Sequence, residues 1–309
     1  MILHQSCQLC GSKNLSGFAI DTNRVGPHIS RVKCEDCGIV FANPMADTKE
    51  LELYYESYYD KENYKEISYK EKILLELSRI EKLDLSQIKL KIRYLKNLEP
   101  GNKFLDVGCG LGLGLAYAHQ IGCELYATEF DKESLEFVKN RFPVKTHHGN
   151  LSSAKFPNDF FDFVHISHVI EHLPDPRAYI REMKRILKPG GIMAIGTPDM
   201  SSRLYTFHRW FNFLRFRIPD VIDGLEHTFI FPKKRLRSIT EEEGFVVIDH
   251  YTHNIGEKLT HLLHYQIPLS KKISRLMQNV FHVNQWIICN HNWFGRHHFN
   301  TNKKNSYYI

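Results

Sequence analysis

Short apolar stretches typical of buried strands alternate with helix-like stretches from Lys103 onward in this chain of 309 residues. In the helix-like stretches apolar residues recur on one side, and the turn Lys188–Gly191 and Gly244 are expected to end two of them. Strands that alternate with helices in this way form a parallel sheet covered on both faces. The pattern therefore predicts a doubly wound α/β domain. The predicted strands are 104–107, 125–128, 160–167, 192–196, 245–250 and 285–290, and the predicted helices are 113–120, 132–140, 176–187 and 233–243.

Composition and charge exclude several other classes of protein. Hydrophobic residues make up 42% of the chain and charged residues 25%, which excludes a disordered or fibrous protein. No apolar run reaches the roughly 18 residues that a membrane-spanning helix needs. The net charge of +6 is too small for the dense positive field of a dedicated nucleic-acid binder. The first residues lack the basic and apolar regions of a signal peptide, so we expect a cytoplasmic protein with reduced thiols.

Two CxxC pairs lie near the N-terminus, Cys7 with Cys10 and Cys34 with Cys37. Each pair can form a tight knuckle, and the four thiolates can surround one Zn²⁺ tetrahedrally. Such a closed site would be structural, because a catalytic zinc needs an open coordination position. Free or disulfide-bonded cysteines are the alternative, and reducing conditions disfavour the disulfides. We therefore predict a zinc ribbon over residues 1–48, which the metal stabilises because the segment is too small for a core of its own.

A glycine-rich turn, Gly108–Gly112, joins the first predicted strand of the α/β domain to the first helix. Its three glycines let the backbone approach a ligand closely and adopt turn conformations closed to other residues. The dinucleotide fingerprint GxGxxG requires glycine at position 113, where this chain has leucine, so NAD is disfavoured. Glu129 ends the next strand, where a carboxylate can accept hydrogen bonds from both hydroxyls of a ribose. A turn that serves only packing in another α/β protein is the alternative interpretation.

The motifs around this turn resemble those of class I S-adenosylmethionine-dependent methyltransferases. The resemblance rests on LDVGCGLG, ATEFD, FDFVHISHVIEHLPDP, LKPGG and IMAIGTP. It implies a Rossmann-like sheet of seven strands with the last strand antiparallel, and S-adenosylmethionine as the cofactor. Asn150 departs from the family, which usually has Asp at this adenine-side position, but an amide can also hydrogen-bond adenine. Carried over residue by residue, the resemblance implies a cofactor site of Asp106, Gly108, Cys109, Gly110, Gly112, Glu129, Phe130, Asn150 and Leu151.

Further blocks resemble one bacterial subfamily of these enzymes. EHTFIF followed by LRSITEEEGF is similar to a block of that subfamily, and the CxxC pairs with RVKCEDCGIVFANPMAD are similar to its zinc-ribbon leader. Such proteins are commonly associated with enzymes of sugar and surface-polysaccharide biosynthesis. The resemblance therefore implies a sugar or nucleotide-linked sugar as the methyl acceptor. Without this resemblance to the subfamily, the residues indicate only a methyltransferase, and the first interpretation is an acceptor that is a small metabolite bearing a hydroxyl or amine.

Three residues with acid–base side chains follow the predicted strand 160–167: His168, Glu171 and His172. They should lie at the carboxyl edge of the sheet, where ligands of doubly wound folds bind. Histidine can act as a base near neutral pH, and a nearby carboxylate can orient it. His227 is a further candidate base, because its segment can fold over the pocket. The alternative is that these residues shape the loops and cap the next helix without contacting a substrate.

An aromatic and arginine-rich segment precedes the predicted helix 233–243 and occupies the usual place of a substrate lid. Its arginines can bind a phosphate of a nucleotide sugar. A helix on a membrane surface is the alternative, disfavoured because apolar and basic positions do not separate on a helical wheel. The predicted organisation is a zinc ribbon at 1–48, a helical leader at 49–98 with a break near 84–86, a methyltransferase domain at 99–293 with the lid at 204–231 and a helical insertion at 257–280, and a polar tail at 294–309.

Two other functions compete with a metabolite methyltransferase. An RNA methyltransferase could grip nucleic acid with its zinc ribbon, but the ribbon has only scattered basic residues. The strand 160–167 also lacks the Asn-Pro-Pro-aromatic turn that many base-amine methylases use. A non-enzymatic module could bind the cofactor without transferring its methyl group, which the intact glycine turn and Glu129 disfavour. At this stage the oligomeric state and the type of atom methylated stay open, and a small molecule is favoured over nucleic acid as the partner.

Overall fold

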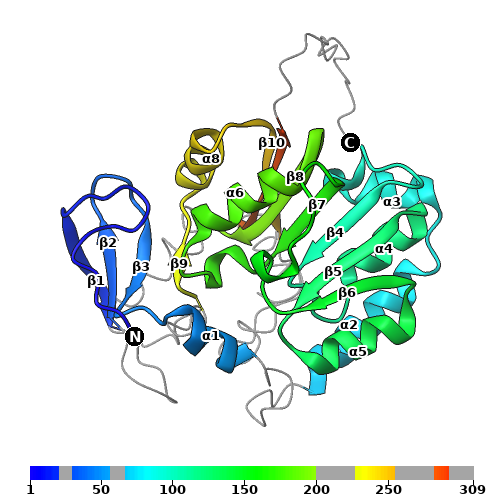
Figure 1. Cartoon of the computed structure of the whole chain (residues 1–309), viewed down its shortest axis with the longest axis horizontal. Helices are drawn as coiled ribbons and strands as arrows, with labels where there is room; N and C mark the ends of the chain where they lie inside the picture. Colours follow the sequence, from blue (N-terminus) through cyan, green and yellow to red (C-terminus); the bar gives the residue numbers. More distant parts are fainter. Residues whose placement is uncertain (21–29, 56–66, 200–226, 255–281, 292–309) are drawn as a thin grey trace, which may run out of the picture.

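A seven-stranded sheet forms the centre of the computed structural model, which describes residues 1–20, 30–55, 67–199, 227–254 and 282–291 (Figure 1). The strand order is β10-β11-β8-β7-β4-β5-β6. Neighbours among β4 to β8 run parallel, whereas β11 is antiparallel to both β8 and β10. The predicted doubly wound sheet with an antiparallel last strand is therefore confirmed. The strands are β4 (Lys103–Val107), β5 (Glu124–Glu129), β6 (Val144–His148), β7 (Phe161–Ser167), β8 (Leu187–Pro198), β10 (Phe245–Asn254) and β11 (His282–His291).

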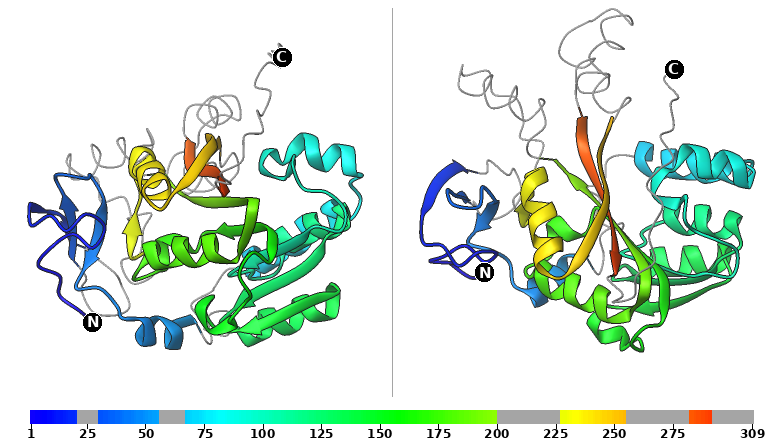
Figure 2. Two further views of the ribbon diagram at one scale, coloured as in Figure 1. Left: turned by 45° about the horizontal axis from the view of Figure 1, so that its top comes forward. Right: turned by 90° about the horizontal axis from the view of Figure 1, so that it is seen from above.

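Helices cover both faces of this sheet, as the two views of Figure 2 show. One buried core joins the sheet to α2, α3, α4 and α5, and a second core joins the opposite face to α6 and α8. Successive side chains of β4 point to opposite faces of the sheet, as in any strand. Phe104 therefore packs in the first core and Leu105 in the second. The helices are α2 (Ile67–Ile80), α3 (Leu85–Lys91), α4 (Leu113–Ile121), α5 (Lys132–Arg141), α6 (Pro176–Ile186) and α8 (Lys233–Glu242).

β10 and β11 are longer than predicted, and β6 and β8 differ from the prediction in kind. β6 is absent from the predicted strands because four of its five residues are polar and it occupies an edge of the sheet, where side chains stay partly exposed. β8 begins at Leu187, so the turn Lys188–Gly191 belongs to this strand as well as ending α6. The pairing with β7 shifts register between Phe161 and Phe163. This irregularity accommodates the extra residues of the Pro-Gly-Gly segment in β8. Turn residues in the sequence do not by themselves indicate that the strand continues through them.

The N-terminal ribbon forms part of a second, antiparallel sheet in the order β1-β2-β3-β9. Its fourth strand comes from the end of the segment predicted as a lid: Phe229 of β9 pairs with Phe41 of β3. The rest of that segment (204–226), the predicted helical insertion (257–280) and the polar tail (294–309) lie outside the described residues. The strands are β1 (Leu15–Ile20), β2 (Ser30–Cys34), β3 (Val40–Asn43) and β9 (Phe229–Ile230).

Helix α1 (Thr48–Tyr55) follows the ribbon and lies at the start of the predicted helical leader. The predicted break in the leader is confirmed, because Asp84 caps α3 and forms a reciprocal capping box with Gln87. Among the described residues no helix is both long and apolar enough to span a membrane.

Candidate active site

A cavity of about 1000 Å³ opens at the carboxyl ends of β4, β5 and β7. Its wall combines the glycine-rich turn after β4, Glu129 at the end of β5 and the residues that follow β7. Tyr55 of α1 and His227, which lies two residues before β9, also line it. The volume is at the upper end of the range of about 300–1000 Å³ found for ligand sites, so a nucleoside cofactor and a small acceptor fit together.

Glu129 and the glycine-rich turn form one side of the cavity. The Glu129 carboxylate accepts hydrogen bonds from the backbone N–H groups of Gly110 at 2.8 Å, Phe130 at 2.7 Å and Asp131 at 3.2 Å. Burial raises the pKa of Glu129, and these three N–H groups oppose that shift. Gly108 has φ +67°, and a Cβ there would lie 2.4 Å from Val169 Cγ2, so only glycine fits. The turn therefore presents bare backbone beside a fixed carboxylate.

A buried Asp–His pair lies beneath this turn. Asp106 of β4 and His165 of β7 are register partners, and Asp106 Oδ1 lies 2.7 Å from His165 Nδ1. The His165 ring stacks against Tyr94 and Trp286 at centroid distances of 5.2 and 5.5 Å, and these two rings also stack on each other at 4.4 Å. His165 lines the cavity, yet sequence analysis missed it, because its position inside an apolar strand carries no distinguishing spacing.

Most of the predicted cofactor residues line this cavity, but two do not. Gly112 is the N-cap of α4 with φ +82°, and Leu151 is buried in the core at 1% exposure. Asn150 lies in the wall, where Oδ1 accepts from Ser153 N at 2.8 Å and Nδ2 donates to Glu52 Oε1 at 3.2 Å. The lining members of the predicted set are Asp106, Gly108, Cys109, Gly110, Glu129, Phe130 and Asn150.

The opposite side of the cavity brings together all four candidate acid–base residues. Glu171 Oε1 lies 3.4 Å from His168 Nδ1 and 4.0 Å from His172 Nε2. The His172 and His227 rings are 4.8 Å apart between centroids. Thr197 donates to Glu171 Oε2 at 2.9 Å. Glu171 itself is buried, whereas the three histidines line the cavity.

The surroundings of this cluster favour a charged Glu171 and an uncharged His227. Burial alone would raise the pKa of Glu171, but the contact with His168 and the charges of the neighbouring histidines outweigh it and lower the pKa to about 2. Burial, aided by the charge of His172, lowers the pKa of His227 to about 3. At neutral pH the cluster therefore contains an ionised carboxylate and a neutral His227.

The ribbon and α1 contribute directly to this side of the cavity. The Tyr55 hydroxyl lies 2.9 Å from His172 Nδ1. Arg31 of β2 is 2% exposed and donates to the backbone oxygen of His227 at 3.3 Å. Thr228, the next residue, donates through its hydroxyl to the His172 backbone oxygen at 2.9 Å. Sequence analysis did not single out Tyr55 or Arg31 as site residues, because these contacts join positions far apart in the chain.

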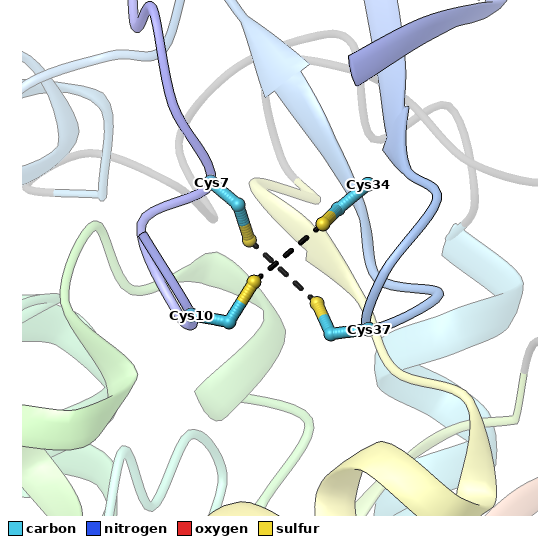
Figure 3. Close-up of side chains that lie close together, drawn as sticks. All are labelled: Cys7, Cys10, Cys34 and Cys37. Carbon is cyan, nitrogen blue, oxygen red and sulfur yellow. Dashed lines mark hydrogen bonds between the residues drawn. The ribbon is translucent and has the colours of Figure 1, made fainter. Parts of the chain in front are cut away.

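The four ribbon cysteines converge on one point (Figure 3). Cys7 Sγ lies 3.7 Å from Cys37 Sγ, and Cys10 Sγ lies 3.5 Å from Cys34 Sγ. Sulfurs bound tetrahedrally at about 2.3 Å from Zn²⁺ are about 3.8 Å apart, so the cluster has the size of a zinc site. The contact between Cys7 and Cys37 lowers the pKa of the Cys7 thiol to about 5 and raises the pKa of Cys37, so Cys7 is the thiolate of this pair.

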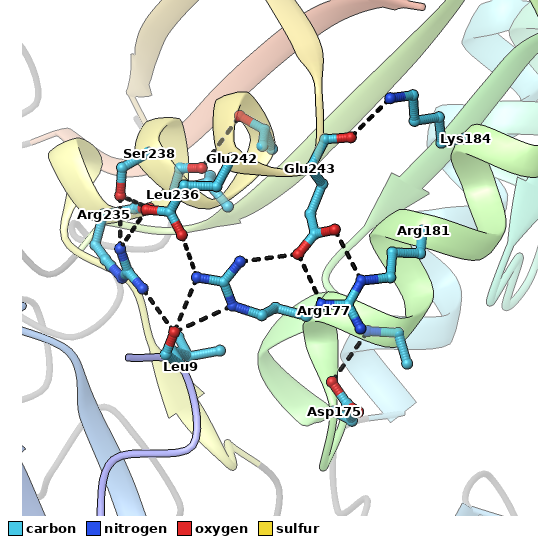
Figure 4. A network of polar contacts seen from close by, with 12 residues as sticks. Leu9, Asp175, Arg177, Arg181, Lys184, Arg235, Leu236, Ser238, Glu242 and Glu243 are labelled. Carbon is cyan, nitrogen blue, oxygen red and sulfur yellow. Dashed lines mark hydrogen bonds and ion pairs between the residues drawn. The ribbon is translucent and has the colours of Figure 1, made fainter. Parts of the chain in front are cut away.

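An arginine network fastens the first cysteine knuckle to the α/β domain (Figure 4). The backbone oxygen of Leu9, between Cys7 and Cys10, accepts hydrogen bonds from Arg177 of α6 and from Arg235 of α8. Both arginines also pair with Glu242, which follows on the same helix as Arg235. The ribbon is thus held at a fixed position beside the cavity.

The fold and the glycine-turn site together define a class I S-adenosylmethionine-dependent methyltransferase domain. A family model described as a methyltransferase domain matches residues 80–250, and the chain belongs to this family. The chain is thus an S-adenosylmethionine-dependent methyltransferase, an enzyme.

Named relatives and a solved structure agree with this family. Demethylmenaquinone methyltransferases of Geobacillus sp. and Listeria monocytogenes are each 30% identical over 54% of this chain, covering 81% and 79% of those proteins. An S-adenosylmethionine-dependent methyltransferase of Mycolicibacterium smegmatis is 33% identical over 32% of this chain, which spans only 39% of that relative. A structure of the Haloferax volcanii Trm112 methyltransferase activator with a candidate methyltransferase has a TM-score of 0.50 at 17% identity, covering 68% of this chain and 91% of that one, and so shares the fold.

Proposed function

We propose that this methyltransferase acts on a hydroxyl or amine of a small metabolite, and that the acceptor is a sugar or nucleotide-linked sugar for surface glycan. One observation supports methyl transfer, namely that a single cavity is lined by Glu129 with the glycine turn and by His168, which contacts the buried Glu171; the resemblance to the subfamily supplies the sugar. The first side suits a ribose and the second suits a group that loses a proton. A cofactor at the first side leaves the second for the acceptor.

The chain's own residues account for cofactor binding in this proposal. Bound S-adenosylmethionine supplies a methyl group on a sulfonium, which is already activated for in-line displacement. Glu129 accepts hydrogen bonds from the ribose hydroxyls, and the bare backbone at Gly108 and Gly110 allows close approach. Asn150 hydrogen-bonds the adenine edge from its place in the wall. The enzyme's main contributions are positioning and the exclusion of water.

His168 is the general base in this proposal. Its side chain is 49% exposed at the cavity wall, compared with 15% for His172, so an acceptor can reach it more readily. The ionised Glu171 faces His168 Nδ1 and orients the ring. As the acceptor atom bonds to the methyl carbon, its proton passes to His168. His172 and His227 stay candidate bases, and both are held deeper in the same cluster.

A structural Zn²⁺ bound by Cys7, Cys10, Cys34 and Cys37 completes the proposal. The sulfur separations support tetrahedral coordination, and four thiolates leave no position open for a substrate. The ribbon then supports the active site from within the same molecule, through the pairing of β3 with β9 and through Arg31. This internal role needs no nucleic-acid partner.

The acceptor is identified by tracing a labelled methyl group. Purified protein, cell extract and S-adenosylmethionine labelled on its methyl group are incubated together, and RNA, protein, lipid and nucleotide-sugar fractions are then separated. We expect label in the nucleotide-sugar or glycan fraction. Demethylmenaquinone belongs in the same panel as an acceptor, because relatives are named for it. Label in RNA, or in the quinone alone, would overturn the sugar acceptor.

A further inference from the structure

We infer that Glu171, His172 and His227 bind a divalent transition-metal cation on the acceptor side of the cavity. The inference rests on the proposed function, because the cation's role is to hold the acceptor hydroxyl. One ligand atom from each of these residues lies within 4.8 Å of the other two. The cluster shares no residue with the four cysteines, so it is a second and separate site.

Two buried polar atoms of the cluster make no well-formed hydrogen bond within the described part of the chain: Glu171 Oε1, which has only the longer ion-pair contacts with His168 and His172, and His227 Nδ1. Glu171 is 1% exposed, so water cannot solvate this oxygen freely. A buried polar atom that lacks a well-formed hydrogen bond is costly, and buried polar atoms of folded proteins nearly always have one. A cation that accepts a lone pair from each atom would satisfy both at once.

Neighbouring hydroxyls already hold the other ends of two of these side chains. Thr197 donates to Glu171 Oε2 at 2.9 Å, which leaves Oε1 directed toward the histidines. The Tyr55 hydroxyl lies 2.9 Å from His172 Nδ1, which leaves Nε2 facing Glu171. In metal sites, outer hydrogen bonds of this kind orient the ligands and fix the imidazole tautomer.

The type of donor selects the class of cation. Two imidazoles and one carboxylate suit Mn²⁺, Fe²⁺, Co²⁺ or Zn²⁺, whereas Mg²⁺ and Ca²⁺ prefer oxygen ligands alone. Donors bound at about 2.1 Å from a shared ion lie about 3–4 Å apart, so side-chain movements below about 1 Å close the site. Three protein ligands leave coordination positions open on the ion.

Those open positions define the class of acceptor. His172 and His227 line the cavity, so an ion bound to them faces the acceptor. A hydroxyl bound to a divalent cation loses its proton more readily. The proton passes to His168, and the oxygen keeps the electron pair that bonds to the methyl carbon. An acceptor with two adjacent oxygens, such as a vicinal diol, binds best because it fills two positions, and oxygen is the atom methylated.

Binding of Mn²⁺ alone tests the site without any acceptor. The full chain is prepared with zinc in the ribbon and titrated with Mn²⁺, and the free ion is followed by electron paramagnetic resonance. We expect one Mn²⁺ per chain. Glu171→Gln and His227→Ala should each weaken this binding at least about tenfold. His119→Asn, which removes an exposed histidine of α4, is the matched control and should bind like the wild type.

Each outcome decides for or against the site. Absence of saturable Mn²⁺ binding to the wild type, or unchanged binding to both variants, overturns the inference. If Glu171→Gln fails to fold, judged by its melting transition, His227→Ala decides alone, since it leaves the buried carboxylate in place. Methyl transfer by protein that binds no Mn²⁺ overturns the cation but not the proposed function. Mn²⁺ binding without methyl transfer to any acceptor supports the cation site but overturns the proposed function.

Discussion

The backbone oxygen of Leu9 accepts two hydrogen bonds from the Arg177 guanidinium, from Nε at 3.1 Å and from Nη2 at 2.8 Å. Leu9 lies inside the first cysteine knuckle, and Arg177 lies in the first turn of α6. Arg177 Nη1 also contacts Glu243 at 2.8 Å. A side chain of the α/β domain thus holds the backbone of the ribbon.

Replacing Arg177 by methionine should destabilise the protein. Arg177 is 17% exposed and donates charge-assisted hydrogen bonds to the ribbon, so we expect a loss of about 2 kcal/mol in the free energy of unfolding. Chemical denaturation measures this loss. Arg237→Ala is the control, because Arg237 pairs with Glu241 on one exposed face of α8 and should cost below about 0.5 kcal/mol. Equal losses for the two variants would contradict the role of Arg177.

Glu129→Ala should weaken binding of S-adenosylmethionine by at least about tenfold, or about 1.4 kcal/mol. The substitution removes the ribose acceptor and also the carboxylate that holds the N–H of Gly110. Isothermal titration calorimetry measures the affinity. Glu136→Ala, at an exposed position of α5, is the matched control and should bind normally. An unchanged affinity for Glu129→Ala would remove its ribose role.

His168→Ala should lower kcat by about 10²- to 10⁴-fold, the usual contribution of a general base. His168 contacts Glu171 and not the glycine turn, so the affinity for S-adenosylmethionine should stay close to that of the wild type, whereas the melting temperature should fall because the buried Glu171 carboxylate loses a partner. A steady-state assay with labelled cofactor measures kcat, and His119→Asn serves again as the histidine control. Full activity of His168→Ala would shift the role of base to His172 or His227.

Short sequence patterns predicted the cysteine cluster, the glycine turn and the central sheet. The cysteine spacing, the glycine turn and the alternation of strands and helices each act over a few residues, and each has its predicted counterpart in the structure. The contact of Arg31 with His227 spans 196 positions, and that of Tyr55 with His172 spans 117. Nothing in the sequence near either residue marks such a partner, because folding alone brings them together. The pairing of β9 with β3 escaped prediction for the same reason.

Disrupting the cysteine cluster should therefore impair turnover more than cofactor binding. Cys34 is 0% exposed and ends β2, so Cys34→Ala with loss of the metal should loosen the sheet in which β3 pairs with β9. His227 lies two residues before β9 and receives a hydrogen bond on its backbone oxygen from Arg31, so its position depends on that sheet. Glu129 and the glycine turn belong to the central sheet and need not move.

For Cys34→Ala we expect kcat to fall at least about tenfold, which corresponds to about 1.4 kcal/mol. Calorimetry should give an S-adenosylmethionine affinity near the wild-type value. Cys123→Ala removes a cysteine outside the cluster and should change neither quantity. Full turnover by the metal-free Cys34→Ala protein would show that the ribbon does not position this side of the active site.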